Sequence, residues 1–242
     1  MLVSGLIPNK EPIIRVGLIL PEDNINSIQI SFSDSQCYEL KTGNRSYPTS
    51  NNKEQLALSF VDERLVIAEL GINETTLIIS PSFPNENPYI ILNGITAGRG
   101  FHWEKKISAS YWGTLEFSVS HGKMMCINKL PLEHYLKCVA TSEMSAHCPS
   151  NFLKSQTIVS RSWLLANIEQ KHRHLGFDIC NDDCCQRYQG MANCTEASIK
   201  SANDTFGQAI MFENKICDAR YSKSCGGITE DYKHVWKGDP VP

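Results

Sequence analysis

The sequence predicts an α+β protein with antiparallel β-sheets around a small helical core. Residues 12–129 hold short apolar or alternating runs, which are typical of strands. Residues 130–167 and 195–206 instead repeat apolar side chains at helical spacing. Strands followed by helices favour segregated layers. We expect an extension at 1–11 and one domain at 12–242, with a β-rich part to about 129 and a helical and C-terminal part from about 130.

The composition is that of a globular chain. The 242 residues are 41% hydrophobic and 20% charged, with a net charge of −3. Such a balance does not indicate disorder, and gives no general attraction to nucleic acid or acidic membranes. No apolar run approaches the ~20 residues of a membrane span. The N-terminus lacks the basic and apolar regions of a signal peptide, so none is expected.

The predicted strands follow one another along the first half of the chain. They cover residues 13–20, 27–33, 64–70, 75–80, 89–92, 111–120 and 123–128. His121-Gly122 predicts a hairpin turn between the last two. The polar stretch 42–54 has little periodicity, so we expect a loop there.

Two helices joined by a short turn are predicted over residues 130–167. The buried stripe of the first is Leu132, Tyr135, Leu136, Val139 and Ala140. The second begins after Pro149, with Ser150 or Asn151 as the expected N-cap. Its expected stripe is Phe152, Gln156, Val159, Trp163 and Ala166.

A third helix is predicted over residues 195–206, with Gly207 as its C-cap. Strands at 209–212 and 216–221 should follow, joined by a turn at 213–214. Residues 229–230 could cap a short helix that leads to Trp236.

Ten cysteines permit pairing, but their spacing does not fix any connectivity. For Cys37, Cys126 and Cys138 we favour buried thiols, because cysteine without a disulfide usually packs as a small hydrophobic residue.

The aromatic run 101–104, Phe-His-Trp-Glu, has two interpretations. Its rings could stack on sugars, or a turn could tuck Trp103 onto the core. We favour the turn, because tryptophan is mostly buried.

The helical hairpin carries a specific resemblance. LPLEHYLKCVATSEMS at 130–145 and LKSQTIVSRSWLL at 153–165 resemble the SpoIID/LytB family, whose pattern is close to LPLEDYLxxVxxSEMP and LKAQAVAARSYAL. FDICNDDCCQRYQG at 177–190 and DARYSKSCGGITEDYKHVW at 218–236 resemble the family's FDLCDTTHCQVYRG and DAFYHSSCGGxTEDxxxVW. The resemblance covers about 12–242 and is strongest from 115 onward.

The resemblance implies a lytic transglycosylase that cleaves peptidoglycan glycan strands already stripped of stem peptides. Its catalytic residue would be Glu143, although a lone glutamate at a helix end is usually solvated. The acid protonates the oxygen between N-acetylmuramic acid (MurNAc) and N-acetylglucosamine (GlcNAc). Its carboxylate then accepts a proton from the muramoyl C6 hydroxyl, which closes a 1,6-anhydro ring. No water attacks, so one carboxyl group suffices. A raised pKa, and hence partial burial, is expected.

The LytB name implies an alternative function, a noncatalytic wall-binding enhancer of a cell-wall amidase. A location in the cell envelope is implied by either function. Ser145 and Ser222 stand where the family often has proline and histidine, which weakens the case for an enzyme. Because the family normally continues further, we expect a C-terminus truncated at Pro242.

Further substrate-binding residues follow from the same resemblance. Lys154, Gln156 and Arg161 would bind N-acetyl and lactyl groups, with the Arg161 fork on a carboxylate. The alternatives are an ion pair between Arg161 and a buried acid, and a solvated Lys154. The remaining candidates are Tyr188, Ser224 and Gly226. Paired glycines at 226–227 would allow a strained turn with positive φ.

The block at 177–190 implies a metal site. Cys180 matches the first family cysteine, and Cys184 stands where the family has histidine. Thiolates are ordinary zinc ligands, so Cys180 and Cys184 are candidate ligands for zinc. The alternative is a loop of thiols or disulfides, because the sequence reveals no closed four-ligand set. His172 or His174 could complete the site, although we expect both to lie at an exposed polar helix end.

Overall fold

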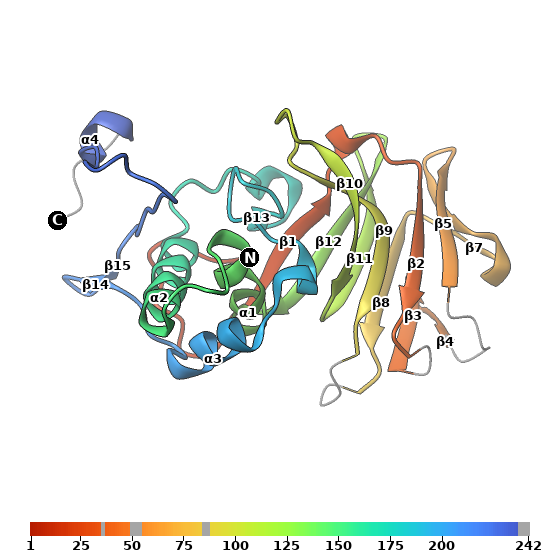
Figure 1. Cartoon of the computed structure of the whole chain (residues 1–242). Helices are drawn as coiled ribbons and strands as arrows, with labels where there is room; N and C mark the ends of the chain where they lie inside the picture. The colour runs from red at the N-terminus through yellow and green to blue at the C-terminus, as the bar shows by residue number, and fades with distance from the viewer. Residues whose placement is uncertain (35–36, 49–54, 84–87, 237–242) are drawn as a thin grey trace.

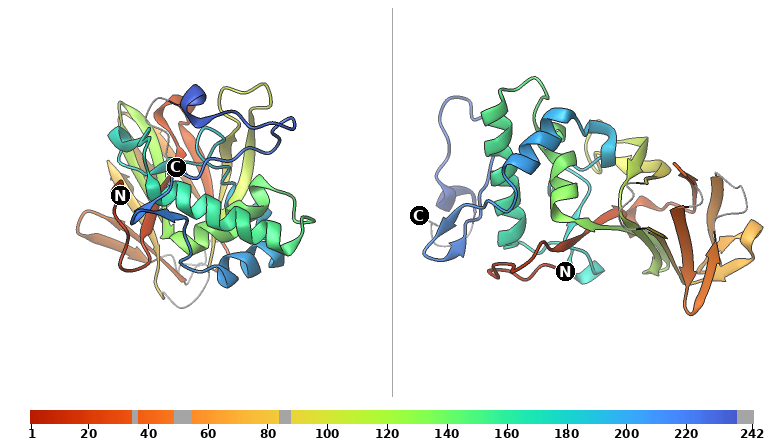
Figure 2. Two further views of the ribbon diagram at one scale, coloured as in Figure 1. Left: turned by 90° about the vertical axis from the view of Figure 1, so that its left-hand side faces the viewer. Right: turned by 90° about the horizontal axis from the view of Figure 1, so that it is seen from below.

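The computed structural model describes residues 1–34, 37–48, 55–83 and 88–236. Two largely antiparallel sheets form one end of the molecule, and three helices pack against one another at the other end (Figures 1 and 2). These helices are α1 (Leu132–Glu143), α2 (Ser150–Ala166) and α3 (Glu196–Asp204); the short α4 (Tyr232–Val235) lies near the C-terminus. The predicted α+β class is confirmed. None of the described helices has the length and apolarity needed to cross a bilayer.

The larger sheet connects the β-rich part to the helices. Its strands, in spatial order, are β13 (Ile179–Cys180), β1 (Ile13–Ile19), β12 (Lys123–Pro131), β11 (Thr114–Ser120), β8 (Thr76–Pro81), β3 (Tyr38–Thr42) and β4 (Arg45–Pro48). β12 leads directly into α1. β13 pairs in parallel with β1, with Gly17 opposite Cys180. The sheet edge therefore holds the cysteine-rich segment close to the start of the helical part.

The second sheet packs onto the first through a shared core. Its strands are β10 (Lys105–Tyr111), β9 (Ile90–Ala97), β2 (Ser27–Phe32), β5 (Gln55–Val61), β6 (Arg64–Ile67) and β7 (Ile72–Glu74). Ile30 and Leu58 of this sheet belong to the same buried cluster as Leu115 and Phe117 of the first. A separate hairpin joins β14 (Met211–Phe212) to β15 (Lys215–Ile216).

Several strands differ from the sequence prediction. β3, β5 and β10 were not predicted, and residues 45–48, expected as loop, form the edge strand β4. β4 pairs with β3 through Leu40 and Tyr47, and an edge strand needs only backbone pairing on one side. Residues 49–54 of that expected loop lie outside the described residues. The returning strand expected at 216–221 is limited to β15.

The helix predictions are confirmed in position, but three details are wrong: the buried face of α2, its N-cap and the C-cap of α3. The buried stripe of α1 is as predicted. The buried face of α2 instead carries Leu153, Gln156, Thr157, Ser160, Arg161 and Leu164, while Phe152 is 46% exposed. Small polar residues occupy this face because Thr157 donates its hydroxyl hydrogen to the Leu153 carbonyl. The N-cap is Pro149, whose carbonyl accepts from the first helical amides, so neither Ser150 nor Asn151 caps the helix.

α3 begins after Thr195, whose hydroxyl accepts from the Ser198 amide. It ends at Asp204 with Thr205 as its C-cap, so the expected Gly207 cap is wrong. Cys37, Cys126 and Cys138 are buried, as predicted.

Candidate functional site

Glu143 is the last residue of α1, and its carboxyl group lies half-buried between three segments. The Arg187 amide donates to its Oε1 at 2.6 Å, and the Tyr221 hydroxyl also interacts with the carboxyl group. Burial raises the pKa of Glu143, and the negative charge of Asp183 adds to this effect. The negative end of the α1 dipole acts in the same direction. These effects outweigh the donors, which stabilise the anion.

A groove of about 410 Å³ opens beside this carboxyl group. It is lined by the end of α1, by α2, by the cysteine-rich segment and by the segment after β15. The lining residues are Glu143, Trp163, Glu169, Lys171, Asp183, Cys184, Cys185, Arg220, Tyr221, Ser222, Lys223 and Trp236. Parts of the chain that are far apart in sequence therefore assemble one polar site.

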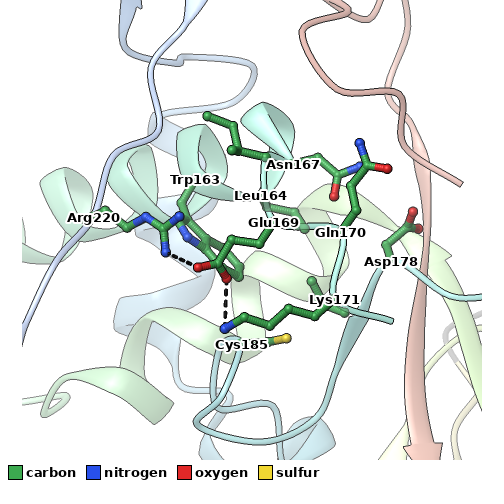
Figure 3. A pocket seen from close by; sticks show the side chains of 11 residues that line it. Trp163, Leu164, Asn167, Glu169, Gln170, Lys171, Asp178, Cys185 and Arg220 are labelled. Atoms are coloured by element: carbon green, nitrogen blue, oxygen red, sulfur yellow. Dashed lines mark hydrogen bonds and ion pairs between the residues drawn. The ribbon is translucent and has the colours of Figure 1, made fainter. Parts of the chain in front are cut away.

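One wall of the groove is held by Arg220. Its guanidinium binds Asp218 and Glu169, and it lies 4.9 Å from the centre of the Trp236 ring. Glu169 also binds Lys171 at 2.8 Å, so its carboxylate lies between two cations (Figure 3). Burial raises the pKa of Glu169, but these cations outweigh it and lower the pKa overall. Glu169 therefore stays ionised near neutral pH and is unsuited to donate a proton.

Asp183 is the second carboxyl group in the groove whose pKa is raised. Burial is the main cause, and the Arg187 guanidinium partly opposes it. When both are ionised, Glu143 and Asp183 repel each other, and this repulsion raises the pKa of Glu143. The groove thus contains two acidic groups that resist ionisation and one, Glu169, that favours it.

A cluster of four metal-binding side chains borders the groove. The ligand atoms of His172, Cys180, Cys184 and Cys185 all lie within 4.8 Å of one another. The sulfur atoms of Cys180 and Cys184 are 3.0 Å apart, and Cys184 Sγ is 3.8 Å from His172 Nε2. A tetrahedral zinc site with bonds of about 2.3 Å separates its ligand atoms by about 3.8 Å. The sulfur–nitrogen spacing matches this value, and the closer sulfur pair would have to separate by about 0.8 Å to hold a tetrahedral ion with three sulfur ligands and one nitrogen ligand.

The thiols of the cluster differ in acidity, because their shared hydrogen bonds raise the pKa of Cys180 and Cys185 and lower that of Cys184. Hydrogen bonds from Cys180, Cys185 and His172 lower the pKa of the Cys184 thiol, which provides the thiolate that a metal needs. His172 stacks on Phe177 at 5.0 Å between ring centres, which holds the imidazole in place. His172 was expected at an exposed helix end. Its ring instead faces the thiols, so that expectation is wrong for the side chain. The four residues could hold a metal ion.

Comparison with known proteins finds a family model that covers most of the residues around the site. Residues 120–212 match the family model described as "SpoIID: Stage II sporulation protein". This part of the chain is therefore similar to a SpoIID domain. The matched residues include α1, α2, α3 and the cysteine-rich segment, and the SpoIID family is linked to cell-wall and sporulation functions.

A curated relative is an uncharacterized protein of Brachyspira hyodysenteriae. It is 29% identical over 132 residues, which are 54% of this chain and 36% of the relative. The matched part of the chain thus spans about a third of the length of this relative.

The fold does not bring Arg161 to the groove. The Arg161 side chain is 1% exposed, and its Nε and Nη2 atoms bind both carboxylate oxygens of Glu133 at 2.9 and 2.6 Å. Its remaining nitrogen, Nη1, donates to the Gln208 carbonyl. Gln156 is also buried and donates to Ser160. The substrate roles expected for Arg161 and Gln156 are corrected to structural ones, because no face of either side chain is open to a ligand.

Lys154 and Tyr188 also lie away from the groove. Lys154 binds Asp204 of α3 at 2.8 Å. Tyr188 is 1% exposed, donates to Asn128 and packs against Tyr111 and Tyr135. Lys154 therefore holds two helices together, and Tyr188 belongs to the core. Tyr188 is closed to a ligand, whereas the Lys154 side chain is 32% exposed and its substrate role stays a prediction.

Ser224 and Gly226 lie in an exposed turn that follows the groove residues Ser222 and Lys223. Gly226 and Gly227 have φ angles of +65° and +102°, so the expected positive φ is confirmed. The groove lining includes neither Ser224 nor Gly226, and their substrate role stays a prediction.

The sequence alone did not indicate Asp183, Arg187 and Tyr221 as site residues. Tyr221 contacts Glu143 from a segment more than 70 residues away, so no local pattern could reveal it. Arg187 could have been found, because it is a cation between two residues, Gln186 and Tyr188, that are both buried. In an extended segment, alternate residues point to the opposite side.

The aromatic run at 101–104 forms the expected turn, but among the described residues Trp103 is not one of those packed against the buried core. The Glu104 carboxylate accepts from the Gly100 amide, and Trp103 packs against Gly98. A Cβ atom at Gly98 would lie 2.4 Å from the Trp103 ring, and Gly98 also has a φ of +76°, so glycine is required there. The turn does not bury both rings, because Phe101 is 46% exposed and stacks on Trp103.

Proposed function

We propose that this chain is a lytic transglycosylase that cleaves the MurNAc–GlcNAc bond of peptidoglycan glycan strands stripped of stem peptides. The observation that carries the proposal is the state of Glu143. Its carboxyl group is half-buried in a polar groove, and its pKa is raised. A carboxyl group that holds its proton toward neutral pH suits general acid catalysis.

The proposed reaction needs one carboxyl group in two protonation states. Glu143 donates its proton to the glycosidic oxygen as the bond from that oxygen to muramoyl C1 breaks. The leaving GlcNAc thereby gains a hydroxyl group. The muramoyl C6 oxygen then bonds to C1 and gives its proton to the Glu143 carboxylate. Glu143 returns to its protonated state, and no water is consumed.

The surroundings of Glu143 support this use of the carboxyl group. The Arg187 amide donates to Oε1, so that oxygen accepts a fixed hydrogen bond and the acidic proton belongs on the other oxygen. Tyr221 interacts with the same carboxyl group and restricts its rotation. A fixed acid loses less orientation entropy when it reacts.

Asp183 makes a second mechanism worth testing. The sequence indicated no partner carboxylate on the hairpin itself, and Asp183 arrives from the cysteine-rich segment. Glycosidases that use water employ two carboxyl groups. The chemical form of the product separates the two mechanisms, because hydrolysis leaves a reducing end and transglycosylation leaves a 1,6-anhydro end.

We further propose that the ion of the four-residue cluster is zinc. Three thiols and one imidazole form a closed set of four ligands, which is typical of structural zinc sites. Such a site leaves no position for substrate, so its contribution is to hold the cysteine-rich segment. That segment supplies the Arg187 amide to Glu143.

The deciding experiment is mass spectrometry of purified denuded glycan strands after incubation with the protein alone. We expect fragments with 1,6-anhydro-MurNAc ends, and none with the Glu143→Gln variant. Fragments with reducing ends would replace this mechanism with hydrolysis. An absence of fragments, combined with a faster reaction of an added amidase on intact wall, would favour the noncatalytic enhancer.

A further inference from the structure

We propose that Arg187 and Trp103 form a subsite beside Glu143 that recognises the free lactyl carboxylate of a muramoyl residue. The proposal rests on the proposed glycan-cleaving function, and it names the side chains that distinguish bare strands from peptide-bearing ones. The subsite lies on the cysteine-rich segment and on the β9–β10 turn.

Arg187 differs from the other arginines around the site. Arg99, Arg161 and Arg220 each bind one or more carboxylates. Within the described residues, no carboxylate forms an ion pair with Arg187, and its buried Nε–H has no hydrogen-bond acceptor. The Arg187 side chain as a whole is only partly buried, so an anionic ligand can bind the part of its guanidinium that is not covered and supply the missing counter-charge.

Trp103 provides the second half of the subsite. The Arg187 guanidinium lies 5.2 Å from the centre of the Trp103 ring, within the range of a cation–π contact. Phe101 stacks on Trp103 at 5.7 Å with an interplanar angle of 18°. A cation and a partly exposed aromatic pair thus lie side by side. This combination can bind the apolar face of a sugar and an acidic substituent on it.

The subsite is held firmly in place relative to the groove. Asp182 accepts hydrogen bonds from the Gly98 and Arg99 amides at 2.8 Å each. The Arg99 guanidinium binds Asp23 and Asn181. These contacts fasten the β9–β10 turn to the cysteine-rich segment. Trp103 therefore keeps its position next to Arg187 without a bound ligand.

The distance from Glu143 suits one strand bound across both parts. The Arg187 amide binds Glu143 while its guanidinium contacts Trp103, so one arginine side chain spans from the acid to the aromatic pair. A sugar next to the cleaved bond can therefore reach the subsite. In a bare strand each muramoyl lactate is an anion, whereas a stem peptide converts it to a neutral amide. The planar arginine fork binds a carboxylate through two parallel hydrogen bonds, which an amide cannot match.

Binding measurements test the subsite separately from catalysis. We would measure the Kd of the Glu143→Gln protein for denuded strands, and for the same strands with lactyl carboxylates converted to simple amides. Adding Arg187→Gln to this protein removes the guanidinium but keeps the backbone amide that binds Glu143. Arg64→Gln is the matched control. Arg64 lies on β6 of the second sheet, and this substitution removes the same charge as Arg187→Gln.

We expect amidation of the strand and Arg187→Gln each to raise Kd by about 10- to 100-fold, the range of a charge-assisted hydrogen bond. The two changes together should cost little more than one, because they remove the same contact. Arg187→Lys should restore part of the affinity, and Arg64→Gln should change it less than twofold. In the active protein, Arg187→Gln should raise KM for bare strands more than it lowers kcat.

Equal Kd values for carboxylate and amide strands would overturn the proposal, whatever the cleavage assay gives. An equal loss of affinity for both strands on Arg187→Gln would also overturn it, since that result indicates structural damage. If no strand is cleaved but the Kd pattern holds, the glycan-cleaving function fails and the subsite stands as a wall-binding site.

Discussion

The Arg187 amide donates a 2.6 Å hydrogen bond to Oε1 of Glu143, and so joins the cysteine-rich segment to the last residue of α1. The same arginine directs its guanidinium onto Trp103. One residue thereby links the candidate acid, the metal-binding cluster and the aromatic turn. The site depends on the position of a main-chain segment as much as on its side chains.

Replacing the acid should separate chemistry from folding. Glu143→Gln keeps the size of the side chain and an acceptor for the Arg187 amide, but the amide group cannot donate an acidic proton. We expect anhydro product to fall below detection while the circular dichroism spectrum stays unchanged. Wild-type product yield from Glu143→Gln would remove Glu143 from the mechanism.

The raised pKa of Glu143 predicts the pH dependence of cleavage. The acid must begin protonated, so the rate should fall as pH rises through a pKa above the ordinary value of 4.5. The Arg187 charge lowers this pKa, so Arg187→Gln should move the alkaline limb of the kcat profile to higher pH. An alkaline limb that stays in place in the variant would contradict this electrostatic coupling.

The same pKa shift predicts an effect on stability. Between 4.5 and the raised pKa, the folded state holds a proton that the unfolded state has lost. Glu143 therefore contributes most to stability below about pH 4.5, and that contribution is lost as pH rises through the folded pKa. Glu143→Gln should raise Tm at pH 7 and leave it nearly unchanged at pH 4. Equal Tm differences at both pH values would show that the effect does not come from ionisation.

Removal of the metal should loosen the site. We expect about one zinc ion per chain by metal analysis, since one four-ligand set is present in the described residues. Cys184→Ser should lose the ion, lower Tm and reduce cleavage, because the Arg187 amide would no longer be held against Glu143. Cys225→Ser is the matched control, because Cys225 is, like Cys184, an exposed cysteine and lies outside the cluster. Metal-free protein with unchanged Tm and full activity would contradict the assignment.

The pair formed by Arg161 and Glu133 should prove structural. Glu133→Gln leaves the Arg161 guanidinium buried without its full counter-charge, and we expect a loss of roughly 3–5 kcal/mol in the free energy of unfolding. Replacing both residues by methionine and leucine should cost much less, because no unpaired charge remains. Denaturant unfolding measures both variants. A stable Glu133→Gln variant with a large rise in KM would instead return Arg161 to the binding site.

The sequence predicted the helices and most strands because their apolar periodicity is local. It placed the acid at the end of α1 for the same reason. The buried face of α2 lies about one residue from the predicted one. Thr157 donates its hydroxyl hydrogen to the Leu153 carbonyl and the Ser160 hydroxyl accepts from Gln156, so both residues pack in the buried structure like small apolar ones. Edge strand β4 escaped detection because an edge position does not require alternating burial.

The candidate site was harder to predict because distant segments assemble it. The resemblance assigned Arg161 to the substrate, but an arginine within such a motif can equally serve an ion pair, here with Glu133. His172 joins Cys180 and Cys184 only because residues 172–177 turn back onto the sheet edge. Spacing along the chain cannot show such a return.

Asp183 provides the final test of mechanism. A transglycosylase uses one carboxyl group, so Asp183→Asn should still form 1,6-anhydro ends, with kcat changed by less than about tenfold. The pKa of Glu143 should fall slightly, because Asp183 raises it as a neighbouring anion, and the alkaline limb should move to lower pH. If Asp183→Asn instead abolishes cleavage while Tm and zinc content are kept, Asp183 acts directly on the reaction. Reducing-end products from the wild-type protein would then assign Asp183 to the activation of water, with Glu143 as the acid.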